Sequence, residues 1–138
     1  MSPAVSIAAG ATFLTILGIM YGGTFLLRVS TGGTPFNDLQ KRFFRAGHAH
    51  AGVLLILGLV CLLLAAASGV GGGWQWAGVG VLVSALLIPG GFFLSVLGRD
   101  PQRPSRVIAL LWAGVAVLAA SLVAVGVSLI VAGVAALS

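Results

Sequence analysis

The sequence predicts an all-α integral membrane protein, a four-helix bundle with both termini outside and with loops 1 and 3 in the cytoplasm. Hydrophobic residues fill 59% of the 138 positions and charged residues only 7%, and the mean hydropathy is +1.19. Each apolar run is long enough for a membrane helix, which needs about 20 residues. All seven lysines and arginines fall within two segments, 28–45 and 99–106. Because Lys and Arg are retained on the cytoplasmic side, we expect a multi-pass protein of the cytoplasmic (inner) membrane.

The first helix is expected over residues 3–27. No basic side chain precedes it, and its apolar stretch exceeds the core of a signal peptide, so we interpret it as a retained membrane helix. Gly18 and Gly22 form a G-x-x-x-G face, which lets helix backbones approach closely in lipid. Tyr21 and Arg28 near the end of this helix suit anchoring at the membrane interface.

The second helix is expected over residues 35–67. Thr34 is placed to cap it, and Pro35 suits the first helical position. Asp38 lies near the positive end of the helix dipole. The opening turns alternate aromatic and basic residues, so we expect them to lie in the headgroup region before the helix enters the membrane.

The third and fourth helices are expected over residues 75–97 and 105–137. Pro89 lies inside the third helix, where proline removes a backbone hydrogen bond and usually bends the helix. A hinge, a cavity or a simple bend would each explain it. The fourth helix carries residues at heptad spacing that predict a seam for a neighbouring helix. They are Trp112, Ala119, Gly126 and Gly133. Together the four helices make one transmembrane domain, 1–138, with no separate soluble domain.

The charged residues and the single cysteine exclude several function classes. A net charge of +5 and a pI near 11.3 would favour nucleic acid as partner of a soluble protein. Here the basic loops orient the chain and attract anionic lipids instead, so no nucleic acid is expected. Asp38 and Asp100, the only acids, both lie in loops, which argues against a proton-coupled exporter with a carboxylate in the membrane. Cys61 alone cannot form a disulfide or a thiolate metal cluster within one chain. Without a catalytic triad or a phosphate-binding loop, the chain is not expected to be an enzyme on its own.

Both histidines, His48 and His50, lie about one turn inside the cytoplasmic interface. Ionisable residues inside a membrane are rare and usually functional. Residues two positions apart on an α-helix point about 200° apart, so the two rings cannot hold one metal ion unless the helix unwinds. Three roles stay open: hydrogen bonding to backbone or to Tyr21 and Thr24, ligation of haem or a metal, and relay of protons or ions.

The two rings are expected on different faces of the helix. His48 shares a stripe with Phe44, Gly52 and Leu55, whereas His50 lies nearer the stripe of Gly47 and Leu54. We therefore favour His48 as the inward residue. Small residues surround both rings, which leaves space for a neighbouring helix or a flat cofactor.

A His-x-His pair that opens a membrane helix after Arg45 resembles the His-x-His helix of haem-copper-oxidase-like membrane proteins, including the haem- and copper-containing family associated with nitric oxide response. The likeness covers about a dozen of the 138 residues. Those proteins carry further histidines on other helices, and this chain has none, so a complete bis-histidine haem site within one chain is excluded. The resemblance implies His48 or His50 as one axial or metal ligand, Met20 or a second subunit as the other, and Tyr21 and Arg45 beside the cofactor. The whole chain also resembles small four-helix membrane proteins of high-GC bacteria, a class without an assigned activity.

The function that we favour from the sequence is a small, accessory membrane subunit. It oligomerises through its small-residue faces, as a homodimer or a larger homo-oligomer, and has a histidine site near the cytoplasmic face. One alternative is a haem- or metal-binding redox protein that uses His48 and His50. Another is a homo-oligomeric proton or ion channel. The expected partners are the lipid bilayer, further copies of the chain, and a membrane complex.

Overall fold

The computed structural model describes residues 2–33, 35–69 and 74–137. These segments contain helices α1 (Pro3–Ser30), α2 (Asp38–Ala67), α3 (Gln75–Ser95) and α4 (Ala109–Ala135), and a short 3₁₀ turn, Arg106–Ile108, precedes α4. No β-strand occurs in the described part of the chain. All four helices are long and apolar enough to span a membrane, which confirms the all-helical class and is typical of a multi-pass membrane protein.

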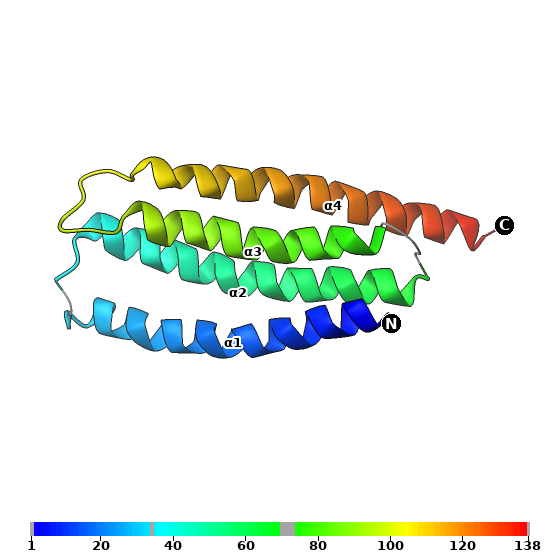
Figure 1. Ribbon diagram of the computed structural model, residues 1–138, viewed down its shortest axis with the longest axis horizontal. Coiled ribbons are helices and arrows are strands. Elements are labelled where there is room, and N and C mark those ends of the chain that lie inside the picture. The colour runs from blue at the N-terminus through cyan, green and yellow to red at the C-terminus, as the bar shows by residue number, and fades with distance from the viewer. Residues whose placement is uncertain (1, 34, 70–73, 138) are drawn as a thin grey trace.

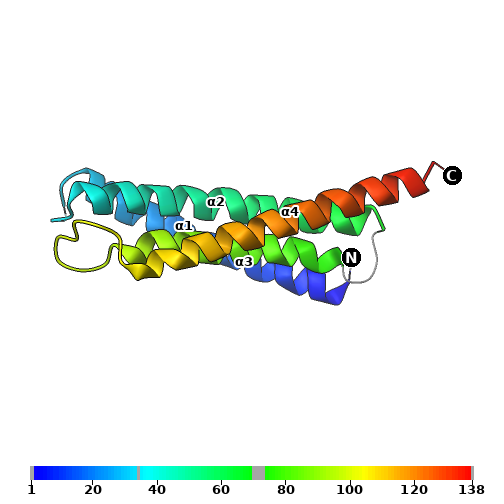
Figure 2. The ribbon, with the colours of Figure 1, turned by 90° about the horizontal axis from the view of Figure 1, so that it is seen from above.

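The helices alternate in direction along the chain. Both termini therefore lie at one end of the molecule, and the links 31–37 and 96–105 lie at the other (Figure 1). All lysines and arginines occur in or beside these two links, and we call this end the basic end. Helices α2 and α3 lie at the centre, with α1 and α4 on opposite sides of them, and α4 crosses over the central pair (Figure 2).

The buried core lies between α2, α3 and α4. One cluster joins Leu54 to Ala85 and Ile88, and the other joins Cys61 to Val81 and Val125. Glycines allow these helices to approach closely: a Cβ added at Gly58 would clash with Leu82, one at Gly91 with Leu111, and one at Gly114 with Ile88. Helix α1 supplies no residue to either cluster, so it is a peripheral helix on a three-helix core.

Helix α2 begins later than the sequence analysis expected. Its first residue is Asp38 and its cap is Asn37, so the predicted start at Pro35 is wrong. The Asn37 side chain accepts from the Gln40 backbone at 2.9 Å, and the Gln40 side chain accepts from the Asn37 backbone at 3.1 Å. This reciprocal pair satisfies two backbone N–H groups that have no partner within the helix. Proline at the first helical position satisfies no such group, because it only lacks an N–H itself. Thr34, the predicted cap, lies outside the described residues.

The remaining helix ends differ from the predictions by a few residues. Helix α1 continues to Ser30, three residues past its expected end, and α3 ends at Ser95, two residues early. The fourth segment opens as a 3₁₀ turn at Arg106, with Ser105 as its cap. Shifts of one or two residues are normal at helix ends.

The packed face of α4 is not the predicted seam. Trp112, Ala119 and Gly133 are exposed, and a Cβ added at Gly126 or Gly133 would meet no atom within 4 Å. The face that packs on the core instead consists of Gly114, Ser121, Val125 and Ser128. Small residues occupy several faces of this Ala- and Gly-rich helix, so heptad spacing alone did not identify the one that is used within the chain.

Two side chains tie the links together at the basic end. The Gln40 amide, only 2% exposed, donates to the Val96 carbonyl at 3.0 Å and to the Gly98 carbonyl at 3.2 Å. The Asn37 amide donates to the Asp100 carboxylate at 2.8 Å. These contacts fix the start of α2 against the α3–α4 link.

Aromatic side chains attach α1 at the same end. The Phe25 ring of α1 lies 5.7 Å from the Phe44 ring of α2, and Phe36 packs against both. At its other end α1 approaches the start of α3, where Val5 is buried and shares a small pocket with Trp76. Helix α1 is thus held near its two ends.

Candidate functional site

His48 projects from α2 toward α1. A Cβ added at Gly22 would lie 3.4 Å from the imidazole Nδ1, and one at Gly23 would lie 3.7 Å from Nε2. The two glycines thus leave room for the ring directly against the α1 backbone. The Gly18–Gly22 face, expected to pack on another helix, meets an imidazole at Gly22 and open space at Gly18.

The ring also borders a cavity of about 400 Å³ between α1, α2 and α3. This volume falls within the range of small-molecule sites, about 300–1,000 Å³. Each of the three helices contributes a stripe of the wall. The lining residues are Ala11, Thr12, Thr15, Gly18, Ile19 and Gly22 from α1, His48, Ala51 and Leu55 from α2, and Leu82, Ala85, Leu86, Pro89 and Phe93 from α3.

His48 is the main polar group of this cavity. The Thr12 hydroxyl donates to the Ala8 carbonyl and the Thr15 hydroxyl to the Thr12 carbonyl, each at 2.7 Å, so both hydrogens are used within α1. The His48 ring forms no hydrogen bond with any described residue. Its two nitrogens lie beside Gly22 and Gly23 of α1, and no described residue uses either of them as a donor or an acceptor.

Pro89 adds a backbone acceptor to the same wall. Proline has no N–H, so the carbonyl of Ala85 loses its usual partner four residues on. Ala85 and Pro89 both line the cavity. The sequence left three interpretations of Pro89 open: a hinge, a cavity or a simple bend. Its position on the wall agrees with the cavity.

The cavity opens sideways between α1 and α3. Thr15 and Gly18 on the α1 wall are exposed, and Leu86 on the α3 wall is 71% exposed. These positions lie in the middle of segments that are long and apolar enough to span a membrane. In a bundle that spans a membrane, an opening at this depth would face lipid chains.

His50 belongs to a different surface. It is exposed, its Nδ1 lies 2.8 Å from the Ala46 carbonyl of the same helix, and its ring lies 5.2 Å from that of Phe92. The two imidazoles thus point to different sides of α2, as the 200° separation predicts. Backbone hydrogen bonding, one of the three roles left open, is the arrangement found at His50.

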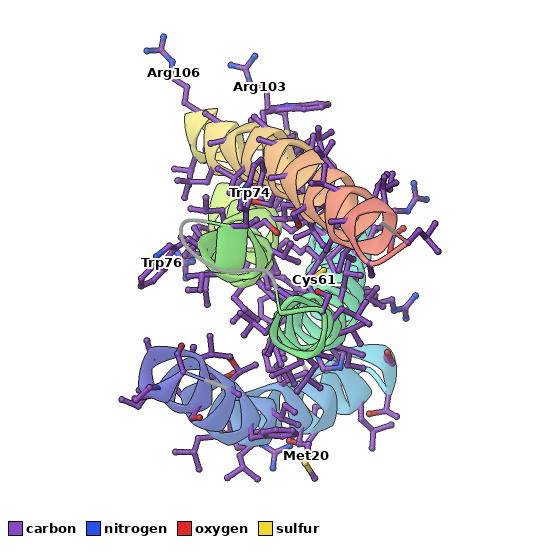
Figure 3. All side chains as sticks on the ribbon, turned by 90° about the vertical axis from the view of Figure 1, so that its right-hand side faces the viewer. Met20, Cys61, Trp74, Trp76, Arg103 and Arg106 are labelled. Atoms are coloured by element: carbon purple, nitrogen blue, oxygen red, sulfur yellow. The ribbon has the colours of Figure 1, made fainter. Side chains whose placement is uncertain are left out.

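The other predicted site residues do not gather at His48. Met20 is 65% exposed and points away from the remaining helices (Figure 3), so one chain cannot use it as the ligand opposite His48. Tyr21 is 75% exposed and Arg45 donates to Ser30 at 3.2 Å. Thr24 donates to the Tyr21 carbonyl, so neither residue is the hydrogen-bond partner proposed for a histidine.

No three His, Cys, Asp or Glu side chains group together as a metal site in the described part of the chain. Haem fits poorly for a related reason, because His48 is the one potential haem ligand among the described residues that line the cavity. A second axial ligand would have to come from another chain. The geometry of one chain therefore offers a hydrogen-bonding site and not a complete ligand set.

Most of the residues that line the cavity were not predicted from the sequence. Ala11, Thr15, Gly18 and Gly22 recur at three- and four-residue spacing, the signature of one helix face. That signal was available, but it was interpreted as a packing face. The chain matches no protein family model, no curated protein and no solved structure.

Proposed function

We propose that this chain is a small oligomeric subunit of the cytoplasmic membrane, non-catalytic on its own, that acts by binding a small molecule at His48. The observation that carries the proposal is an imidazole on a cavity wall without a hydrogen-bond partner among the described residues. Placing an ionisable group at membrane depth is costly, and such groups usually serve a function. A partner within the chain would have explained His48 as structural; its absence favours an external ligand.

Charge supports an orientation for the subunit. Seven basic and two acidic residues all lie at or near the basic end. Under the positive-inside rule this end faces the cytoplasm, with both termini outside. His48 then lies about 4.5 Å deeper than Arg45, at a rise of about 1.5 Å per residue, near the cytoplasmic headgroups.

The composition of the cavity supports a binding role over catalysis. Acid–base and nucleophilic catalysis use at least two cooperating groups, and His48 is the sole ionisable residue on this wall. Cys61 belongs to the core between α2, α3 and α4. Asp38 and Asp100 lie at the basic end.

The outer face of α4 supports oligomerisation. Trp112, Ala119, Gly126 and Gly133 contact no neighbouring helix closely, and small residues of this kind favour helix association in lipid. A two-fold dimer through this face is the simplest closed arrangement. The haem- or metal-binding alternative needs a different contact between copies, because the outer face of α4 lies on the opposite side of α2 and α3 from α1 and the His48 cavity.

Native mass spectrometry of the protein in lipid nanodiscs tests both parts of the proposal. We expect the mass of more than one chain, together with a bound small molecule that His50→Ala retains in full and that His48→Ala retains at a lower occupancy. A strictly monomeric species would contradict the oligomer. The binding role would be refuted by the absence of any bound molecule, or by equal retention in His48→Ala; proton flux in liposomes would then test the channel alternative.

A further inference from the structure

The lining of the His48 cavity restricts the charge of its ligand. No Lys, Arg, Asp or Glu contributes to the wall, and the nearest basic residue in sequence, Arg45, is exposed and bonds to Ser30 instead. A carboxylate or phosphate group would therefore enter an apolar space whose described wall carries no permanent positive charge, which is unfavourable. The wall selects a neutral molecule.

The position of the cavity opening restricts the solubility of the ligand. Access lies between α1 and α3, at positions that face lipid chains. Along α1 the wall extends from Ala11 to Gly22, twelve residues whose eleven steps span about 16 Å at the α-helical rise of 1.5 Å per residue. A ligand that enters here partitions from the bilayer and lays an apolar chain along the Gly18 face of α1.

His48 restricts the polar group that the ligand can carry. A neutral imidazole offers one N–H donor and one acceptor nitrogen, and the Phe93 ring lies on the same wall. A carbonyl or hydroxyl oxygen placed at this end of the cavity would accept or donate one hydrogen bond there. The ring itself lies against Gly22 and Gly23, where added Cβ atoms would come within 3.4 Å of Nδ1 and 3.7 Å of Nε2.

Together these three restrictions define a ligand class. We infer that the His48 cavity binds a neutral, lipid-soluble molecule with a single apolar tail and a terminal oxygen group that hydrogen-bonds to the imidazole. The inference rests on the proposed binding role of His48 and specifies its ligand. A quinone ring and the ester head of a monoacylglycerol both present this chemistry.

The experiment follows the histidine ring directly. Protein labelled with ¹⁵N-histidine in nanodiscs gives signals from two imidazoles, and His50→Gln assigns them. The probes are a decyl-substituted benzoquinone, an uncharged monoacylglycerol, decanoate as the charged counterpart, and haemin. We expect at least one neutral probe to shift the His48 signals saturably and to leave those of His50 unchanged, and decanoate and haemin to produce no such shift.

Two pairs of variants test the geometry. Gly10 and Gly18 both lie on α1, and a Cβ at either meets nothing within 4 Å, but only Gly18 lines the cavity. Gly18→Leu should therefore abolish binding, and Gly10→Leu should leave it unchanged. His48→Leu should weaken binding roughly 3- to 10-fold, the equivalent of one hydrogen bond, and His48→Gln should restore part of it.

The outcomes separate the ligand class from the binding role. Shifts by the quinone alone or by the monoacylglycerol alone support the inference and identify the source of the oxygen. Binding of decanoate as tight as that of the neutral probes, a haem absorption band that depends on His48, or unchanged binding in Gly18→Leu would overturn it. If neither neutral probe binds while the co-purified molecule still depends on His48, the inference fails and the binding role stands.

Discussion

Gly91 lies where α3 approaches the backbone of α4, and replacing it by alanine tests that contact. The added Cβ would collide with the backbone nitrogen of Leu111 and would lie 2.6 Å from its Cβ and 2.8 Å from its Cα. Backbone atoms cannot rotate away as a side chain can, so α4 must shift. Overpacking of this kind costs about 1–3 kcal/mol, and we expect the upper part of that range, about 2–3 kcal/mol, for a backbone collision.

Gly90→Ala is the matched control. Gly90 is the preceding residue on α3, and its added Cβ meets no atom within 4 Å. Both substitutions change the intrinsic helix preference by the same amount, about 0.5–1 kcal/mol in favour of alanine. The difference between the two variants therefore isolates the collision with α4.

Reversible unfolding in mixed micelles, followed by circular dichroism, measures that difference. We expect the unfolding free energy of Gly91→Ala to fall about 2–3 kcal/mol below that of Gly90→Ala. Equal stability of the two variants would refute the close contact between Gly91 and Leu111, and with it the described packing of α4.

The same unfolding assay, and chemical labelling, check two further features. Gln40→Ala should lower the unfolding free energy by about 1–3 kcal/mol, because it leaves the Val96 carbonyl without its buried donor. The control Gln102→Ala, at an exposed position, should change the unfolding free energy by less than about 0.5 kcal/mol. Equal effects of the two substitutions would argue against a buried hydrogen bond at Gln40. Cysteines introduced at Gly33 and Gln102 should react with a membrane-impermeant reagent only from the cytoplasmic side, and labelling from outside would reverse the proposed orientation.

The helices follow closely from the composition of the sequence, because segments of about 20 apolar residues have few alternatives to a membrane helix. The start of α2 did not follow from the composition. The Asn37 and Gln40 pair is readable as a capping box, and it outcompetes the weaker signal of Pro35 because it satisfies two backbone groups at once.

The inward side of α2 was predicted only in part. Phe44 is buried, and His48 and Leu55 line the cavity, but Gly47 and Leu54, on the stripe assigned to His50, are buried as well. The stripe is local and depends only on helical periodicity. The packed face of α4 depends instead on which of several small-residue faces meets α3, and that choice is decided by complementarity with residues far away in the sequence, such as Gly80 opposite Ser121.

The cavity itself could not be predicted, because it exists where contacts are missing. In water, an apolar gap of this size between α1 and α3 would be closed by the hydrophobic effect. In a bilayer that driving force is absent, since lipid chains are as apolar as the helix surfaces, and α1 still contacts the bundle at Val5, at Phe25 and where the His48 ring lies against its backbone. A lipid-facing space beside His48 therefore costs little to keep open and is readily filled by a molecule that already dissolves in the membrane. The weak packing of α1 thus matters for the histidine. If α1 packed as tightly as α3 does, His48 would be enclosed between helices and could bind no ligand.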